Sequence, residues 1–192
     1  MLESRVTIEN IVLSCNISEE VDMEAAHMAL EGSTMNNGRR FPGIKYRMKD
    51  LGATIMIFKG RNIVCTGAST RSLAEKAVQN VINSLRSKGI VSEKCEYTCS
   101  IQNMIGSIRV LNAEFDLEGL VERGGAVMDK RRFPAAIMRI KDAKATFLLF
   151  PKGRIVCSGV KSEEEMREAV RRLLEFLENE RLVSTTPRPS QP

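Results

Sequence analysis

Apolar and polar residues alternate along several segments of the chain, and apolar residues recur with helical spacing along four others. Alternation of this kind predicts half-buried strands, and recurrence every three or four residues predicts amphipathic helices. The predicted strands lie near residues 5–15, 41–48, 53–59, 62–67, 94–110, 133–140, 145–150 and 154–159. The predicted helices lie near residues 20–30, 72–88, 116–123 and 163–180. Each half of the chain is therefore expected to read strand, helix, three strands and long helix.

The two halves also repeat one another in sequence. Residues 39–67 read RRFPGIKYRMKDLGATIMIFKGRNIVCTG, and residues 131–159 read RRFPAAIMRIKDAKATFLLFPKGRIVCSG, with nearly half of the aligned positions identical and no gap. A repeat of this size indicates that one folding unit was duplicated. We expect a first repeat over residues 1–92 and a second over residues 93–183. The Pro-rich residues 184–192 are expected to form a disordered tail.

One face of the predicted sheet has no helix to cover it. In residues 53–59, Ile55 and Ile57 point to one face, whereas Thr54, Met56 and Phe58 point to the other. The helices of each repeat suffice to bury one face only. The other face is expected to be an open sheet of Val, Leu, Met and Phe with small hydroxyl residues. An exposed apolar surface of this kind indicates a binding partner.

The charge pattern indicates which partner this is. The chain carries a net charge of +5. Its basic residues gather on the predicted strands at 39–61 and 131–154, where Asp50 and Asp142 are the single acidic residues. The acidic residues gather on the predicted helices. This distribution favours a polyanion lying along the sheet over a dimer that buries two apolar sheets against each other.

Other classes of function receive little support from the residues. The only histidine, His27, lies on a predicted amphipathic helix, and the sequence contains no recognisable Cys–His or Ser–His–Asp set. We therefore expect that the protein is not an enzyme and that it binds no cofactor or metal. The five cysteines, at 15, 65, 95, 99 and 157, show no pattern of disulfide pairing. Cys65 and Cys157 are expected to be buried thiols, and Cys95 and Cys99 lack further ligands for a metal site. No apolar run approaches the ~20 residues of a membrane span. A lipid-type ligand on the sheet would leave the basic residues unexplained.

Several motifs together resemble the TATA-box-binding protein family over nearly the whole chain. They are IENIV (8–12), RRFPGIKYRM (39–48), MIFKGRNIVCTGA (56–68), IQNMIGS (101–107), RRFPAAIMRIK (131–141) and LLFPKGRIVCSGVKSEEE (148–165). The resemblance implies an α+β fold, a two-fold pseudosymmetric saddle with a curved antiparallel sheet on its concave side and helices on its convex side. The family is itself a standard example of proteins that bind and kink A·T-rich DNA through the minor groove.

The resemblance also implies roles for residues at matching positions. The DNA-intercalating residues would form one pair in each repeat, Phe41 with Phe58 and Phe133 with Phe150. The minor-groove contacts would be Asn10, Asn103, Val12, Ile105, Met56, Leu148, Val64, Val156, Thr66, Ser158, Pro42 and Pro134. The phosphate contacts would be Arg40, Arg47, Arg132, Arg139 and Arg154.

By resemblance, the protein would be a transcription initiation factor that recruits a transcription factor IIB-like partner and RNA polymerase, in the nucleus of a eukaryote or the cytoplasm of an archaeon. It could form a homodimer through the open sheet when DNA is absent. Relatives commonly carry an acidic loop before the second-repeat Phe, whereas residues 127–133 here read VMDKRRF. Asn62 also stands where the family often has Lys. The alternative is a diverged paralogue that acts mainly as a protein-interaction scaffold.

Overall fold

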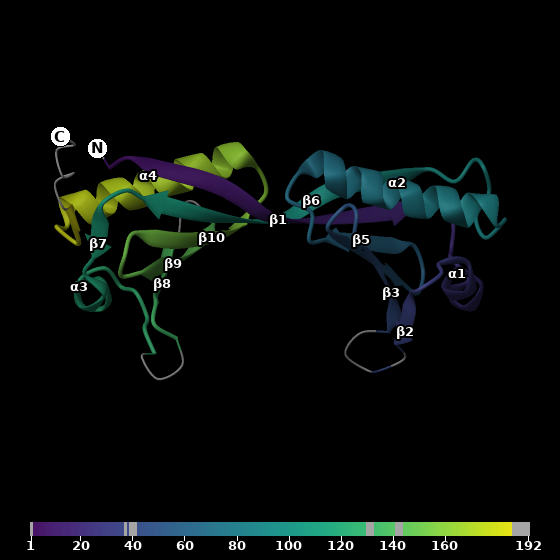
Figure 1. The fold of residues 1–192 in the computed structure, drawn as a ribbon, viewed down its shortest axis with the longest axis horizontal. Helices are drawn as coiled ribbons and strands as arrows, with labels where there is room; N and C mark the ends of the chain where they lie inside the picture. The colour runs from purple at the N-terminus through teal and green to yellow at the C-terminus, as the bar shows by residue number, and fades with distance from the viewer. Residues whose placement is uncertain (1, 37, 39–41, 130–132, 141–143, 186–192) are drawn as a thin grey trace. The chain divides into compact units, whose positions relative to one another are not determined.

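The computed structural model describes residues 2–36, 38, 42–129, 133–140 and 144–185. Its contacts divide the chain into two compact units. We call Glu9–Asn103 the N-unit, and we call Met1–Ile8 together with Met104–Pro192 the C-unit. These units follow packing, whereas the repeats at 1–92 and 93–183 follow sequence similarity. Two long strands, β1 (Ser4–Ile17) and β6 (Tyr97–Val110), each contribute residues to both units (Figure 1).

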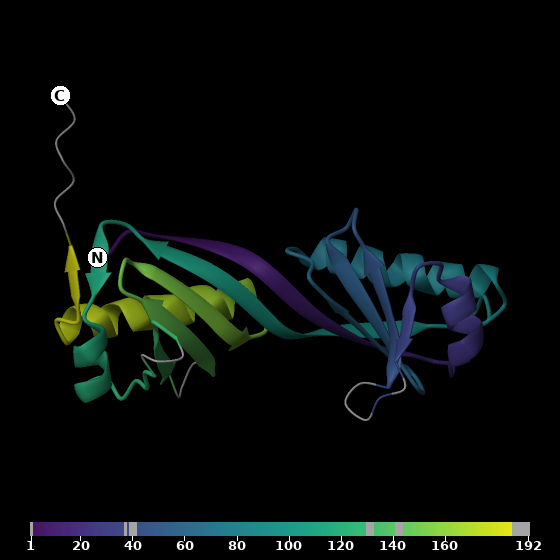
Figure 2. The same ribbon diagram turned by 60° about the horizontal axis from the view of Figure 1, so that its bottom comes forward.

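The N-unit is an antiparallel sheet with two helices. Its strand order is β2-β3-β4-β5-β1-β6. Besides its parts of β1 and β6, the unit contains α1 (Met23–Ala29), β2 (Thr34–Asn36), β3 (Gly43–Met48), β4 (Ala53–Phe58), β5 (Asn62–Thr66) and α2 (Arg71–Ser87). Strands β3, β4 and β5 run side by side within this unit (Figure 2).

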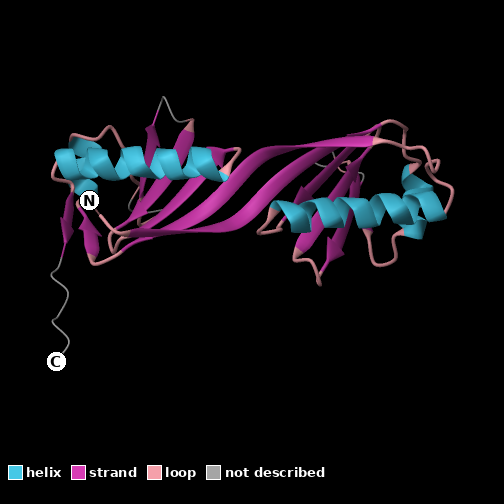
Figure 3. Ribbon diagram, turned by 90° about the horizontal axis from the view of Figure 1, so that it is seen from above, coloured by secondary structure: helices cyan, strands magenta, loops and turns pink. Residues whose placement is uncertain are grey.

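The C-unit repeats this arrangement. Its strand order is β1-β6-β10-β9-β8, and β7 and β11 form a separate pair. Besides its parts of β1 and β6, the unit contains β7 (Ala113–Phe115), α3 (Leu117–Glu122), β8 (Ala136–Ile140), β9 (Ala145–Phe150), β10 (Arg154–Val160), α4 (Glu163–Asn179) and β11 (Val183–Thr185). Each long helix lies across the strands of its own unit (Figure 3).

One face of each sheet is buried beneath a long helix. In β4, Ala53, Ile55 and Ile57 are fully buried, while the residues between them are half-buried. In β9, Phe147 and Leu149 are fully buried in the same way. Burial of a large aliphatic or aromatic side chain stabilises the fold by about 1.5–3 kcal/mol. These alternate residues fix the strand register, because a slip by one position would expose them.

The long helices begin at the caps that their sequences provide. Thr70 accepts a hydrogen bond from the backbone N–H of Leu73 at the start of α2 (3.2 Å). Ser162 accepts one from Glu165 at the start of α4 (3.1 Å), and the Glu165 carboxylate accepts one from the Lys161 N–H (2.8 Å). Ser162 is thereby the N-cap of α4, and the Glu165 side chain reaches back to the residue before Ser162.

The predicted α+β class is confirmed, and so are all four helices and the eight longer strands, within a few residues at their ends. The pattern missed β2, β7 and β11, because a three-residue strand is too short to show alternation. Ser184 and Thr185 were predicted to begin a disordered tail, but they pair with Glu114 and Ala113 of β7. The hydrogen bonds offered by β7 account for this difference. The rest of the predicted tail lies outside the described residues.

The cysteines confirm one expectation and overturn another. Cys65 and Cys157 are buried free thiols, as predicted. Cys15 and Cys99 were not expected to pair, but they form a disulfide across β1 and β6 of the N-unit, with Cα atoms 4.1 Å apart. The two residues are 84 positions apart in sequence, so no local spacing could reveal the pairing. None of the described helices has the length and apolar character that crossing a bilayer demands.

Candidate nucleic-acid interface

The helix-free face of the N-unit sheet, here called its open face, is organised in rows across the strands. Arg47 of β3 lies opposite Thr54 of β4, which lies opposite Thr66 of β5. The next row contains an apolar pair flanked by polar residues. It runs through Lys45, Met56, Val64 and Ser14. The face therefore has an apolar floor with hydroxyl groups and exposed cations at its borders.

Asn10 has a fixed orientation on this face. Its side-chain oxygen accepts hydrogen bonds from the Gly67 N–H (2.6 Å) and from the Thr66 hydroxyl (3.3 Å). Gly67 has φ +97, and a Cβ atom there would lie 2.6 Å from the Gly52 carbonyl oxygen, so this close approach requires glycine. Because these donors hold the amide oxygen, the NH₂ group of Asn10 is left to face other acceptors.

The open face of the C-unit has the same rows. Arg139 of β8 lies opposite Thr146 of β9, which lies opposite Ser158 of β10. The following row contains mainly apolar residues. It runs through Ile137, Leu148, Val156 and Ser107. The duplicated sequence thus places an arginine and two hydroxyls beside an apolar floor in both units.

Two of the predicted intercalating residues are in contact at one edge of the C-unit. The ring centroids of Phe133 and Phe150 are 5.5 Å apart, and the rings meet edge to face at 71°. Phe133 is 41% exposed, although it is one of the largest apolar side chains in the chain. The Arg154 guanidinium carbon lies 5.3 Å from the centre of the Phe150 ring. In the N-unit, Phe58 is half-buried at the end of β4, opposite Gly43.

The remaining predicted site residues fall into three groups. Those half-buried along the strands that form the open faces are Val12, Asn103, Ile105, Met56, Leu148, Val64 and Val156. Those exposed just before β3 and β8 are Pro42 and Pro134. Those outside the described residues are Phe41, Arg40 and Arg132. The predicted pairing of Phe41 with Phe58 therefore stays a prediction.

Sequence reasoning missed two cations on the open faces, Lys45 and Arg109. Both are exposed, and both alternate with core-facing neighbours, such as Ile44 and Ile108. The alternation that identified the apolar floor would have identified them too. Neither was given a contact role, because the resemblance implied none for Lys45 within its motif at 39–48, and Arg109 lies outside the quoted motifs.

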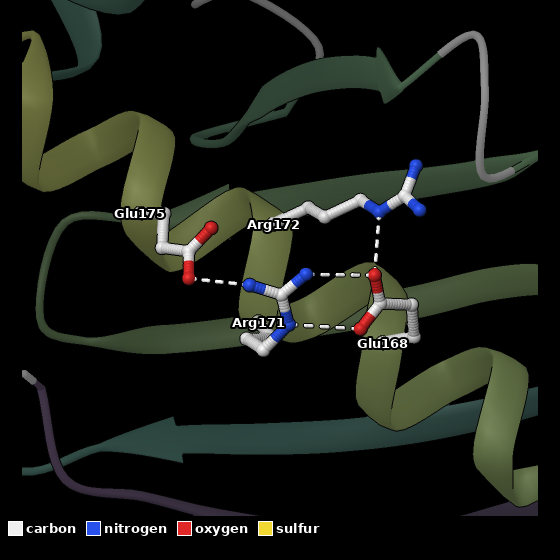
Figure 4. A network of polar contacts seen from close by, with 4 residues as sticks. All are labelled: Glu168, Arg171, Arg172 and Glu175. Carbon is white, nitrogen blue, oxygen red and sulfur yellow. Dashed lines mark hydrogen bonds and ion pairs between the residues drawn. The ribbon is translucent and has the colours of Figure 1, made fainter.

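Acidic residues gather on α4, one of the helices on which the charge pattern predicted them. On α4, Glu168 accepts hydrogen bonds from Arg171 and Arg172, and Arg171 also pairs with Glu175 (Figure 4). The hydrogen bonds from Arg171, followed by those from Arg172, lower the pKa of Glu168 to about 2. This carboxylate remains ionised at neutral pH, and its oxygens accept hydrogen bonds from arginines of the same helix.

Of the residues that the structure describes, His27 is hydrogen-bonded and the free thiols are buried. His27 Nδ1 lies 2.8 Å from the Ser33 hydroxyl, beside α1. Burial raises the pKa of Cys65 to about 11 and that of Cys157 to about 12, so both thiols are protonated at neutral pH. Among the described residues, no three His, Cys, Asp or Glu side chains are grouped to hold a metal ion.

The loop that precedes the Phe133–Phe150 pair is only partly described. Val127 is 68% exposed and forms an isolated antiparallel bridge with Ile137, its N–H and carbonyl both hydrogen-bonded to that residue. The Phe133 N–H donates to the Asp129 carbonyl (2.9 Å). The basic part of the loop, residues 130–132, lies outside the described residues.

A duplicated unit of antiparallel sheet, with a long helix on one face and an apolar floor bordered by cations on the other, defines a class of two-repeat α+β proteins. The family model described as transcription factor TFIID (or TATA-binding protein, TBP) matches residues 5–88 and 98–180. The chain belongs to the TATA-binding protein family.

Relatives and a solved structure agree with this assignment. The TATA-box-binding protein of Methanopyrus kandleri is 33% identical over 178 residues, which cover 89% of this chain and 95% of that protein. The TATA-box-binding protein of Pyrococcus abyssi is 35% identical over 180 residues, 93% of each chain. The structure of Methanococcus jannaschii TBP matches with a TM-score of 0.81 at 30% identity, covering 91% of this chain and 99% of that one.

Proposed function

We propose that this protein is a general transcription initiation factor that binds A·T-rich promoter DNA in the minor groove. The observation that carries the proposal is the row of one arginine and two hydroxyls beside an apolar floor, present on both units. Arginines at the borders suit backbone phosphates, and the floor suits the base edges and sugars of the groove.

The apolar floor gives the preference for A·T pairs. The minor-groove edge of G·C carries the guanine N2 amino group, which would lose water without gaining an acceptor against Met56, Val64, Leu148 and Val156. The NH₂ group of Asn10, and that of Asn103 by the repeat, would donate to adenine N3 or thymine O2. Because A·T and T·A present the same acceptors, these contacts do not distinguish the two.

The phenylalanine pairs supply the wedges. The Phe133 ring is exposed and is held edge to face against Phe150, so the pair presents a ready-made apolar wedge. Wedges of this kind enter a base step, partly unstack it and bend the duplex away from the protein. Phe41 and Phe58 would act in the same way on the N-unit.

Partner recruitment follows from the family. We propose that the DNA-bound protein recruits a transcription factor IIB-like protein and RNA polymerase, and that it acts where the genome is, in a nucleus or in an archaeal cytoplasm. Because residues 130–132 are basic, the IIB-like partner is expected to carry acidic residues opposite them. A cognate partner that bound undiminished after Lys130→Glu with Arg131→Glu would contradict this complementarity.

The primary test is bending of an end-labelled FRET duplex with a TATAAA-type sequence, beside a G·C-rich duplex. We expect tight, A·T-selective binding with a large change in transfer efficiency. The Phe58→Ala/Phe150→Ala variant should lose the bend, because each truncation removes one ring of a wedge. Met28→Ala, which changes an 85% exposed side chain on α1, is the matched control and should behave as wild type.

The alternative function, a diverged paralogue that acts mainly as a protein-interaction scaffold, is supported by the basic sequence at residues 130–132. Under this alternative, the protein would bind DNA without A·T selectivity or bending and would act mainly through partners. The same FRET experiment separates the two, because selective bending belongs to the promoter-binding function alone. Sedimentation of the free protein, with and without the duplex, would test whether a homodimer forms through the open sheet and dissociates on DNA.

A further inference from the structure

Two arginines face each other directly on the open face of the C-unit. Arg154 of β10 lies opposite Arg109 of β6 in the antiparallel register. Both side chains are exposed, and their neighbours Ile108, Val110 and Ile155 are buried on the helix side. The Cβ atoms of directly opposed residues lie about 5 Å apart, where like charges destabilise a sheet. An anion bound between the two arginines would remove this repulsion.

Among the described residues, no carboxylate supplies that anion. The Arg109 Nη1 atom donates to the Lys152 carbonyl oxygen (2.9 Å), and Arg154 lies over the Phe150 ring. Both contacts orient a guanidinium group without neutralising its charge. Within the part of the chain that the structure describes, the ion pairs join other residues, and neither Arg109 nor Arg154 has a carboxylate partner.

The turn that holds Arg109 is itself anchored. Gly153 has φ +67, and a Cβ atom there would lie 2.5 Å from the Val110 carbonyl oxygen, so only glycine fits. The Val110 N–H donates to the Gly153 carbonyl (2.8 Å), and the Phe115 N–H donates to the Pro151 carbonyl (2.9 Å). The Lys152 carbonyl, which accepts the Arg109 hydrogen bond, therefore lies in a turn held by backbone hydrogen bonds on both sides. The side chain of Lys152 adds a further positive charge to this turn.

The N-unit carries a neutral pair at the matching position. Asn62 aligns with Arg154, and Asn16 aligns with Arg109, in the two repeats. Asn16 lies directly opposite Asn62, and its Nδ2 atom donates to the Asn62 side-chain oxygen (3.3 Å). The two amides are uncharged and hydrogen-bond to each other, so this pair does not attract an anion. The same place in the fold thus differs in charge by two between the units.

We propose that Arg109 and Arg154 form a clamp for one phosphodiester of the DNA backbone, which the N-unit lacks. Two guanidinium groups on adjacent strands can each donate two hydrogen bonds to the non-bridging oxygens of a phosphate. The clamp anchors one end of the bound site more strongly than the other, so it sets the orientation of the protein on an asymmetric duplex. The inference rests on the proposed function and assigns to Arg109 a role that the repeat motifs do not reveal.

The test is a methylphosphonate scan, in which single backbone phosphates of an asymmetric A·T-rich duplex are replaced by an uncharged group. For the wild-type protein, one replacement near the end contacted by the C-unit should weaken binding about tenfold, the effect of losing one good charge-assisted contact. The corresponding replacement at the other end should have little effect. In Arg109→Asn/Arg154→Asn, which copies the N-unit pair, the sensitive phosphate should disappear.

Two further measurements accompany the scan. The slope of log affinity against log salt should fall by about 0.9 in Arg109→Asn/Arg154→Asn, as expected for the loss of one phosphate contact. The reciprocal variant Asn16→Arg/Asn62→Arg should create a sensitive phosphate at the opposite end. The thermal stability of Arg109→Asn/Arg154→Asn should equal or exceed that of wild type, because the substitutions remove a like-charge pair.

The outcomes separate this inference from the proposed function. A wild-type protein that fails to bind the unmodified duplex overturns the promoter-binding function. Binding with an equal response at both ends, or a scan unchanged in Arg109→Asn/Arg154→Asn, overturns the clamp alone. Inorganic phosphate that displaces the duplex at equal phosphate concentration would also overturn it, because the pair would then be a site for free anions.

Discussion

At the scale of single residues, the polar groups that each open face can offer to a ligand are those without a hydrogen-bond partner within the protein. Asn10 is oriented because the Gly67 N–H and the Thr66 hydroxyl occupy its oxygen. Asn16 and Asn62 satisfy each other, whereas Arg109 and Arg154 cannot. Residue type alone does not reveal these differences. They arise from which side chains the strand register places opposite one another.

The orientation of Asn10 leads to a prediction about DNA affinity. Asn10→Ala removes the amide donor and should weaken binding to an A·T-rich duplex by about 1–2 kcal/mol, the net value of one or two hydrogen bonds. Fluorescence anisotropy titration would measure the change. Asn83→Ala on the exposed side of α2 serves as the control and should leave affinity unchanged. Equal affinity of Asn10→Ala and wild type would show that the amide makes no groove contact.

The buried thiols lead to a prediction about pH. Burial raises the pKa of Cys157 from 9.0 to about 12, so the folded state disfavours the thiolate. The stability that depends on this thiol is fully present below pH 9.0 and is lost as the pH rises through the folded value. At neutral pH, iodoacetamide should not label Cys65, Cys95 or Cys157 until the protein is unfolded. Rapid labelling of the native protein, read by mass spectrometry, would contradict this expectation.

At the scale of elements, alternation and helical spacing were sufficient to predict the main strands and the helices. Val64 and Thr66 share the open face with Met56 because strand geometry leaves no other choice. Three elements could not be predicted in this way. The short strands β2, β7 and β11 exist because a neighbouring strand offers them hydrogen bonds, which is information that distant parts of the chain supply.

The candidate site was predictable to the extent that it follows from alternation and repeated motifs. The apolar floor and the Phe133–Phe150 pair are of this kind. The disulfide and the Arg109–Arg154 pair were not, because each joins strands far apart in sequence and depends on register. A single sequence defines the faces of a strand but does not state which strand lies beside it.

The disulfide leads to a prediction about stability. A bond between Cys15 and Cys99 closes a long loop in the unfolded chain, and such bonds typically stabilise a protein by about 2–4 kcal/mol. A reductant should lower the free energy of unfolding of the wild type by this amount, measured by denaturant titration. The Cys15→Val/Cys99→Val variant should not respond to reductant. A wild-type protein equally stable with and without reductant would mean that the bond contributes nothing.

At the scale of the whole molecule, the chain is one unit used twice, with charge distributed differently in the two copies. Both copies keep the arginine and the hydroxyls beside an apolar floor. They differ at Asn62 and Arg154, and also at Lys45 and Ile137, which occupy the same row position on their open faces. Duplication therefore provides the arrangement that the two open faces share, and these residues provide the difference between the units.

The path of β1 has a consequence for synthesis on the ribosome. Leu2, Ser4 and Val6 line a groove with Val170 and Leu174 of α4, and the Leu111 N–H donates to the Glu3 carbonyl (3.0 Å). The C-unit therefore packs the first residues of the chain against a helix that is translated last. The N-unit has all of its residues once Asn103 has emerged, whereas the C-unit must wait for α4. Until then, Leu2, Ser4 and Val6 remain without their α4 neighbours, and a nascent-chain chaperone would meet them in that state.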